Sequence, residues 1–193
     1  TLASFVLAAA ENQTAVATLS AADADAGDTL TFTLAGGADA ALFDLASSTG
    51  VLAFKSSPDF ENPGDANTDN VHELTLQVGD GTVTVTQAVT VTVTDVNDAP
   101  AFTLASFALA AAENQTAVAT VTAADADAGD TLTFTLAGGT DAAMFDLASS
   151  TGVLAFKSSP DFENPGDANT DNVHELTLQV GDGTVTVTQA VTV

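Results

Sequence analysis

The sequence contains the same unit twice. Residues 1–91 align without a gap with residues 103–193, so that residue n of the first copy matches residue n + 102 of the second. The copies differ only at the pairs Val6/Ala108, Leu19/Val121, Ser20/Thr122, Ala38/Thr140 and Leu42/Met144. A repeat of about 100 residues is longer than a solenoid repeat and matches a small whole domain. We therefore predict two domains of one fold, residues 1–98 and residues 99–193, with a linker at residues 95–100.

Charge and hydrophobicity together narrow the class of protein. The chain carries 26 acidic residues against two basic ones, for a formal net charge of −24, and 46% of its residues are hydrophobic. This hydrophobic fraction can bury a core, which argues against an acidic disordered chain. A folded chain with this charge repels itself unless cations bind to it. The two lysines offer no surface for nucleic-acid phosphates, so we expect no nucleic-acid partner.

Several other classes of site and segment are excluded by what the sequence lacks. It has no cysteine, so disulfides and thiolate metal sites are excluded. No apolar run is long enough to cross a membrane, and the N-terminal residues do not resemble a signal peptide. We therefore expect no membrane insertion and interpret the chain as a mature, soluble segment of a longer protein.

Apolar and polar residues alternate along the chain with the period of β-strands. This holds for residues 29–34 (TLTFTL), 72–78 (HELTLQV) and 82–93 (TVTVTQAVTVTV). Gln87 interrupts the last of these, which predicts a bulge or a change of neighbouring strand there. Further strands are expected at SFVLA, TAVATLS, LFDL and GVLAF. About seven short strands per copy, separated by Gly, Asn, Asp and Pro turns, predict an all-β protein of two tandem immunoglobulin-like Greek-key sandwiches.

The acidic residues gather near the predicted strand ends and in loops. In the first copy these positions are Glu11, Asp23, Asp25, Asp59, Glu61, Asp80, Asp95 and Asp98. Carboxylates brought together at one end of a sandwich repel each other unless a hard cation lies between them. Six to eight oxygen ligands in flexible geometry suit calcium better than magnesium or zinc.

Five motifs in one order make the pattern more specific. They are AEN (residues 10–12), DAD (23–25), PDFE (58–61), GDG (79–81) and DVNDAP (95–100). In order and spacing they resemble the calcium-binding motifs of cadherin repeats, in particular the cadherin-like modules of large bacterial surface and secreted proteins. The resemblance covers nearly the whole chain, twice. It implies a cadherin-like sandwich in each copy and Ca²⁺ at the junction between repeats.

The resemblance also implies which residues bind the metal. Junction ligands would be Glu11, Asp59, Glu61, Asp95, Val96, Asn97, Asp98, Ala99, Asp125, Asp127 and Asp182, with Val96 and Ala99 acting through their carbonyl oxygens. Two half-sites would remain at the outer ends: Asp23, Asp25 and Asp80 in the first copy, and Glu113, Asp161 and Glu163 in the second. The linker is one residue shorter than in animal cadherins, so the number of ions per junction, two or three, stays open.

Competing interpretations of single residues are weaker. Asp65, Asn67 and Asp69 have the D-x-N-x-D spacing of a calcium loop but lack its later Gly and Glu, so we predict a polar surface loop. His72 lies on the apolar face of its strand, which predicts a packed residue at the edge of the core. The serines have no neighbouring base, and Trp and Tyr are absent as sugar platforms, so we expect no enzyme activity.

These observations predict a calcium-rigidified structural extender of a large extracellular bacterial adhesin or fibre, located at the cell surface or secreted. Its expected partners are neighbouring repeats of the same array. Two alternatives stay open: a module that binds a carbohydrate or a protein directly, and a subunit that assembles with copies of itself into a filament through open strand edges.

Overall fold

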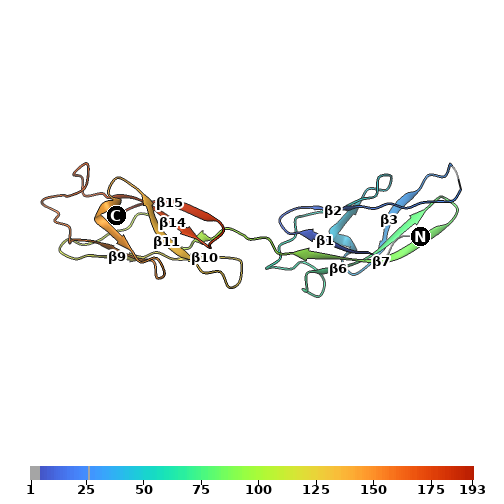
Figure 1. Cartoon of the computed structure of the whole chain (residues 1–193), viewed down its shortest axis with the longest axis horizontal. Helices are drawn as coiled ribbons and strands as arrows, with labels where there is room; N and C mark the ends of the chain where they lie inside the picture. Colours follow the sequence, from blue (N-terminus) through green and yellow to red (C-terminus); the bar gives the residue numbers. More distant parts are fainter. Residues whose placement is uncertain (1–4, 26) are drawn as a thin grey trace. The chain divides into compact units, whose positions relative to one another are not determined.

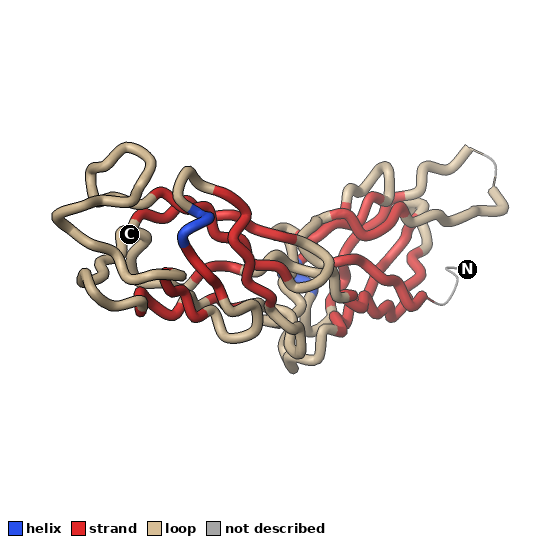
Figure 2. Tube along the Cα trace, turned by 60° about the vertical axis from the view of Figure 1, so that its left-hand side comes forward, coloured by secondary structure: helices blue, strands red, loops and turns tan. Residues whose placement is uncertain are grey.

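A computed structural model describes residues 5–25 and 27–193 of the chain (Figure 1). Internal contacts divide it into two units, Thr1–Val96 and Asn97–Val193. The predicted division between residues 98 and 99 lies slightly further along the linker. Strands make up the framework of each unit, and the helical segments among the described residues are two short 3-10 turns, coloured blue in Figure 2.

The first unit consists of two sheets. The larger has the order β1-β7-β6-β3 and the smaller the order β2-β5-β4. Their bounds are β1 Phe5–Ala10, β7 Thr84–Thr94, β6 Val71–Gly79 and β3 Thr31–Gly36 in the larger sheet, and β2 Ala15–Thr18, β5 Val51–Phe54 and β4 Phe43–Leu45 in the smaller. The 3-10 turn η1, Ala40–Leu42, leads into β4. β1 pairs with β7 in parallel, and every other pairing in the unit is antiparallel.

Alternation along the strands produces the core of this unit. In β6, residues 72, 74, 76 and 78 are buried, while residues 71, 73, 75 and 77 are less so. Leu52 of β5 and Val91 of β7 have no exposed surface. His72 is 3% exposed and packs edge-on against Phe43 and Phe54, with ring centroids 5.5 and 5.1 Å away, which confirms the prediction of a packed histidine.

The second unit repeats this plan with shorter strands. One sheet has the order β11-β14-β15, one the order β12-β13-β9, and β10 pairs with β8. The bounds are β8 Ala101–Phe102, β9 Ala117–Thr120, β10 Ala123–Ala124, β11 Thr133–Gly138, η2 Ala142–Met144, β12 Phe145–Leu147, β13 Val153–Phe156, β14 Glu175–Gly181 and β15 Thr186–Thr192. Residues 107–112, the counterpart of β1, form only an isolated parallel bridge between Ala108 and Thr192.

The prediction of two all-β units is confirmed, and β1 of the first copy overlaps the strand predicted at SFVLA. The bulge predicted as one possibility at Gln87 is wrong, because β7 pairs with β6 without a register shift from Thr84 to Thr92. The other possibility, a change of neighbouring strand, agrees better with the structure, since among the described residues β7 gains β1 as a second neighbour from Val89 onward. Among the described residues, no helix is long and apolar enough to cross a membrane.

Candidate functional site

The strand topology sends the acidic motifs to opposite ends of each unit. β1 and β7 are parallel, so the residues that follow them, Glu11 and Asp95, lie at one end. β6 runs the other way, so Asp80, which follows β6, lies at the other end. We call the first group the AEN cluster (Glu11, Glu61 and Asp95; Glu113, Asp161 and Glu163 in the second unit). The second group is the DAD cluster (Asp23, Asp28 and Asp80; Asp125, Asp127, Asp130 and Asp182 in the second unit).

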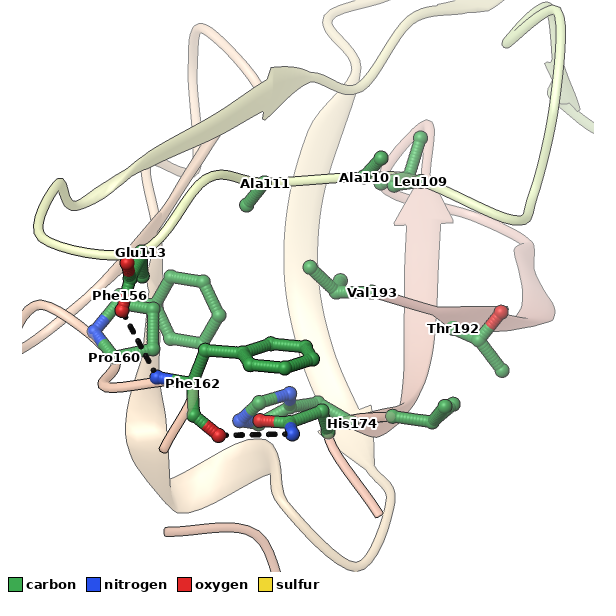
Figure 3. Close-up of a pocket in the computed structure, with 12 residues that line it drawn as sticks. Leu109, Ala110, Ala111, Glu113, Phe156, Pro160, Phe162, His174, Thr192 and Val193 are labelled. Atoms are coloured by element: carbon green, nitrogen blue, oxygen red, sulfur yellow. Dashed lines mark hydrogen bonds between the residues drawn. The ribbon is translucent and has the colours of Figure 1, made fainter. Parts of the chain in front are cut away.

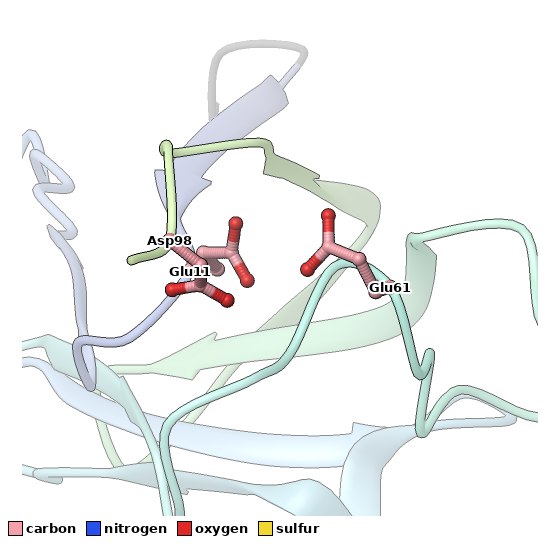
Figure 4. A group of neighbouring side chains, drawn as sticks. All are labelled: Glu11, Glu61 and Asp98. Carbon is pink, nitrogen blue, oxygen red and sulfur yellow. The ribbon is translucent and has the colours of Figure 1, made fainter. Parts of the chain in front are cut away.

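The AEN cluster of the first unit is organised around Glu11, which is 3% exposed. Its Oε2 accepts the N–H of Phe60 at 2.8 Å, and its Oε1 accepts the N–H of Val96 at 2.8 Å. A carboxylate oxygen of Glu61 lies within 4.8 Å of one of Glu11 and within 4.8 Å of one of Asp95. Figure 4 shows Glu11 and Glu61 drawn together. One buried carboxylate therefore holds both the acidic loop and the start of the linker.

The AEN turn itself brings these segments together. Asn12 adopts a left-handed φ of 60°, a conformation that Asn tolerates better than most residues. Its N–H donates to the carbonyl of Pro58 at 3.0 Å, which fixes the PDFE loop beside Glu11. Asp59, a predicted ligand, accepts the N–H of Asn62 at 2.9 Å within that loop.

The DAD cluster of the second unit includes contacts with the linker. Carboxylate oxygens of Asp125, Asp127 and Asp130 lie within 4.8 Å of one another. The linker contributes directly, because the N–H of Asp98 donates to Asp127 Oδ2 at 2.7 Å and the Asn97 side-chain amide donates to Asp182 Oδ2 at 3.0 Å.

The electrostatics of this DAD cluster favour a bound cation. Asp130 is exposed, but partial desolvation by its neighbours, followed by repulsion from Asp125, Asp127 and Asp182, raises its pKa. Asp125 Oδ2 and Asp127 Oδ1 are buried, and within the described part of the chain they accept no hydrogen bond. A buried carboxylate oxygen without a donor costs free energy, and a hard cation removes that cost. The residues present therefore fit a calcium ion.

Asp182, in the GDG turn of the second unit, accepts hydrogen bonds that affect its pKa. The Asn97 side-chain hydrogen bond, followed by the N–H groups of Val185 and Thr184, holds the pKa of Asp182 below its usual range. Asp80 is its counterpart in the first unit, and there the N–H groups of Val83 and Thr82 lower the pKa. The turn alone thus favours the ionised form of Asp80, whereas the turn and the linker residue Asn97 together favour that of Asp182.

The DAD cluster of the first unit and the AEN cluster of the second unit are more exposed than the other two clusters. Asp23, Asp28 and Asp80 place carboxylate oxygens within 4.8 Å of one another, and Asp23 also accepts the N–H of Asp25 at 2.8 Å. Asp25 is not part of that three-residue group. The second AEN cluster brings together its three predicted residues, Glu113, Asp161 and Glu163, all exposed.

Sequence reasoning missed Asp28 and Asp130, which join the DAD clusters from the end of the stretch DADAGD. The signal was a third acid close to the DAD motif. Of the predicted carbonyl ligands, Ala99 lies in the linker, and Val96 uses its N–H to bind Glu11.

The D-x-N-x-D loop is built around a structural carboxylate. Asp65 is 4% exposed and accepts the N–H groups of Asp69 at 2.9 Å and Asn70 at 3.2 Å. Burial raises its pKa, but these hydrogen bonds outweigh burial and the net pKa is lowered. The prediction of a surface loop is right for Asn67 and Asp69, which are exposed, and wrong for Asp65.

Comparisons with known proteins point to one fold. No family model matches the sequence. The chain is 36% identical over 160 residues to protocadherin-16 of Rattus norvegicus, and the match covers 76% of this chain but 5% of the relative. Protocadherin-16 of Mus musculus matches to the same extent. The chain therefore spans about 5% of the length of the curated relatives it matches.

Solved structures agree with this likeness. Human protocadherin-24 EC1-2 matches with a TM-score of 0.60 and 22% identity, covering 96% of this chain and 89% of that one. Mouse cadherin-23 EC22-24 matches with a TM-score of 0.60 and 21% identity, covering 98% of this chain and 62% of that one. The chain thus has a cadherin-like, immunoglobulin-like sandwich fold, in agreement with the prediction from its sequence.

Proposed function

We propose that the chain is a calcium-rigidified extender, in which Ca²⁺ bound at the linker between the two units fixes their relative geometry. The observation that carries this proposal is the pair of buried oxygens, Asp125 Oδ2 and Asp127 Oδ1, which accept no hydrogen bond from any described residue. They belong to the unit that also receives the linker through Asn97 and Asp98.

The ligands would come from both sides of the linker. Glu11, Glu61 and Asp95 represent the AEN cluster of the first unit, together with the neighbouring Asp59. The remaining side-chain ligands would be Asn97, Asp98, Asp125, Asp127 and Asp182, and the structure adds Asp130. Val96 and Ala99 would bind the metal through their carbonyl oxygens. Bound calcium would supply positive charge, and it needs the six to eight oxygens that such a set offers.

The residues of the chain have their own part in this mechanism. Glu11 ties the first linker residues to the first unit through the Val96 N–H, and Asp127 ties the later ones to the second unit through the Asp98 N–H. The linker is therefore anchored at both ends by carboxylates that are also candidate ligands. Losing the cation would leave these carboxylates to repel each other, and the linker would become a hinge.

At the level of the whole protein, we propose a non-catalytic segment of an extracellular adhesin or fibre of a bacterial surface, with neighbouring repeats as partners. The near-identity of the copies supports a spacer, because selection for length tolerates copies whereas recognition of a ligand tends to diversify surface loops. The cadherin-like fold and the matched protocadherins support an extracellular, adhesion-related setting.

Small-angle X-ray scattering of the 193-residue chain tests the junction. With millimolar calcium, we expect one rigid particle, and with chelator a flexible pair of domains. Asp98→Asn and Asp125→Asn should each keep the chain flexible in calcium. Asp44→Asn is the matched control, because it removes the same charge from an exposed position on β4, outside both clusters.

The result that would reject the proposal is equal rigidity of all four proteins in calcium. Circular dichroism checks the fold of Asp98→Asn and Asp125→Asn, and unfolding of either variant would mean that the substituted carboxylate stabilises the sandwich itself. Each sandwich should stay folded, because its core is formed by Val, Leu and Phe side chains away from the linker.

A further inference from the structure

The first unit contains an open groove between η1 and the segment that follows β5. Its volume of about 480 Å³ lies within the range of small-ligand pockets. Leu42, Phe54 and Pro58 give it apolar walls, and His72, which is 3% exposed, also lines it. Beside Gly64, another lining residue, no atom comes within 4 Å of the position that a Cβ would take. The first unit therefore has unfilled space bounded largely by apolar residues.

The second unit frames the same region with one difference in sequence. Of the residues that line the groove, only Leu42 changes between the copies, and its counterpart is Met144. The rim is held in the same way, since the Lys55 ammonium donates to the carbonyl of Ala41 at 2.7 Å and the Lys157 ammonium to that of Ala143 at 2.8 Å. The side chain at residue 42 or 144 is therefore the one change that acts on this region directly.

Met144 shows what can fill the space. Its Cε lies 3.3 Å from the position that a Cβ on Gly166 would take, whereas the matching position on Gly64 meets no atom. Methionine is unbranched and flexible, and it fills irregular apolar gaps. Leu42 is branched, does not reach the position beside Gly64 and is 37% exposed. The walls thus accept an unbranched apolar side chain, which the second unit supplies from its own chain and the first unit does not.

The rim of the groove suits a neutral peptide backbone. Ser56, Ser57 and Asn62 each carry groups that donate and accept hydrogen bonds, as backbone amides do. Lys55 and Asp59 bring opposite charges to the same lining, so the lining alone favours neither a cation nor an anion. The net charge of −24 further disfavours an anionic ligand. A neutral ligand with amide groups and one apolar side chain matches both parts of the groove.

We propose that this groove binds a methionine side chain presented by an extended segment of a partner protein. The side chain enters between Leu42 and Gly64, in the space that Met144 fills in the second unit. The flanking amides of the segment bind at the polar rim. The two units, although nearly identical, thereby differ in function, because the first is open to a partner and the second is closed by its own side chain.

A separate cavity in the second unit has to be distinguished from this groove. It has a volume of about 310 Å³, and Phe156, Phe162 and His174 are among the residues that line it (Figure 3). Neither Met144 nor Gly166 lines it. A ligand that binds in this cavity would therefore not depend on the side chain of residue 144.

The test is a titration of the full chain with the acetylated, amidated tripeptide Ala-Met-Ala, followed by NMR of the backbone N–H groups of Gly64 and Gly166. We expect the Gly64 signal to shift and the Gly166 signal to stay. Leu42→Met should abolish the shift at Gly64, because the longer side chain fills the groove. Met144→Leu should open the second unit, so that Gly166 also shifts. Chelator is present throughout, because Asp59 is also a proposed calcium ligand and the result must not depend on the metal.

Two further probes control for the kind of ligand. The tripeptide Ala-Ala-Ala should bind about 10–100-fold more weakly, the factor expected for burying one methionine side chain. Hexanol tests whether a free aliphatic chain is sufficient. The proposal is overturned if millimolar Ala-Met-Ala leaves Gly64 unchanged, if Ala-Ala-Ala or hexanol binds equally well, if Leu42→Met binds like the wild type, or if Met144→Leu leaves Gly166 unchanged.

Discussion

At the residue scale, one buried carboxylate organises a part of each unit that the sequence motifs did not reveal. Asp39 is 1% exposed and accepts the N–H groups of Ala66 and Glu73, each at 2.8 Å. A side-chain hydrogen bond with Asp39, followed by burial, raises the pKa of Glu73. Asp141 and Glu175 repeat this arrangement in the second unit. The contact between Asp39 and Glu73 was not predicted, because Asp39 lies in a loop, Glu73 lies in β6, and neither residue belongs to a motif.

Replacing Glu73 by Gln should stabilise the chain at neutral pH. The folded-state pKa of Glu73 is raised, so its favourable contribution is present below its unfolded pKa and is lost as the pH rises through its folded pKa. Gln stays neutral and can donate to Asp39 at every pH. The gain in unfolding temperature of Glu73→Gln should therefore be near zero in acid and grow through the pKa of Glu73. Thermal unfolding at several pH values measures it.

Asp44→Asn is the control for this variant, because it removes the same charge from an exposed position. Glu175→Gln should reproduce the effect of Glu73→Gln in the second unit. A gain from Glu73→Gln no larger than that from Asp44→Asn at every pH would mean that only the net charge matters.

Gly37 is required by both its conformation and its surroundings. Its φ is +110°, and a Cβ there would collide with the carbonyl oxygen of Glu73 and come within 2.5 Å of Leu74 Cα. Gly37→Ala should therefore cost about 1–3 kcal/mol for the strained backbone alone, and more for the collision. Gly64→Ala, where φ is ordinary and no atom lies within 4 Å, should be close to neutral. Urea unfolding compares them, and equal stabilities would contradict this account.

At the scale of elements, period-two patterning located the strands well, because each strand buries one face. The patterning was less informative where strand formation or register depends on a neighbouring strand. Gln87 disrupts the hydrophobic pattern but not the hydrogen-bond register of β7. Residues 5–10 form β1 beside β7, whereas the nearly identical residues 107–112 form only a bridge between Ala108 and Thr192. Local sequence cannot distinguish two such identical stretches.

The candidate site was predicted only in part. Most acids of the clusters could be recognised from the motifs, because the motifs lie at the ends of predicted strands. The contacts of individual carboxylate oxygens could not be recognised. Glu11 serves two backbone N–H groups on distant segments, and Asp130 joins its cluster through the loop conformation. Such contacts depend on how loops fold back, which alternation along a strand does not specify.

Core truncation in β5 should affect one unit only. Leu52 is fully buried in the first core and Leu154 in the second, and the two cores share no residue. Leu52→Ala should cost about 2–5 kcal/mol in the first unit. Limited trypsin digestion can locate the damage, because each unit holds one lysine, Lys55 or Lys157. Leu52→Ala should speed cleavage after Lys55, and Leu154→Ala after Lys157; faster cleavage at both sites in either variant would mean that the units unfold together.

At the scale of the whole molecule, we expect the net charge of −24 to make stability dependent on cations. Sites of extracellular modules bind calcium at roughly 10⁻⁴–10⁻³ M, and free calcium at about a hundred times the dissociation constant adds about 2.7 kcal/mol per site. Calorimetry should show a rise of several degrees in unfolding temperature from chelator to calcium. Two controls, sodium chloride at equal ionic strength and magnesium, should each raise the unfolding temperature much less than calcium does. Equal rises with calcium, magnesium and sodium chloride would indicate that the salts only screen the negative charge.

The near-identity of the units has a consequence for how the chain reaches its fold. The parallel pairing of β1 with β7 joins the two ends of a unit, so it forms late and over a long stretch of chain. Residues 5–10 and 107–112 differ only at Val6, whose side chain is 79% exposed and takes no part in the core. Either segment can therefore dock on either sandwich. Refolding from denaturant at high concentration should produce strand-exchanged dimers and intramolecular misfolds in which the first segment of one unit completes the other.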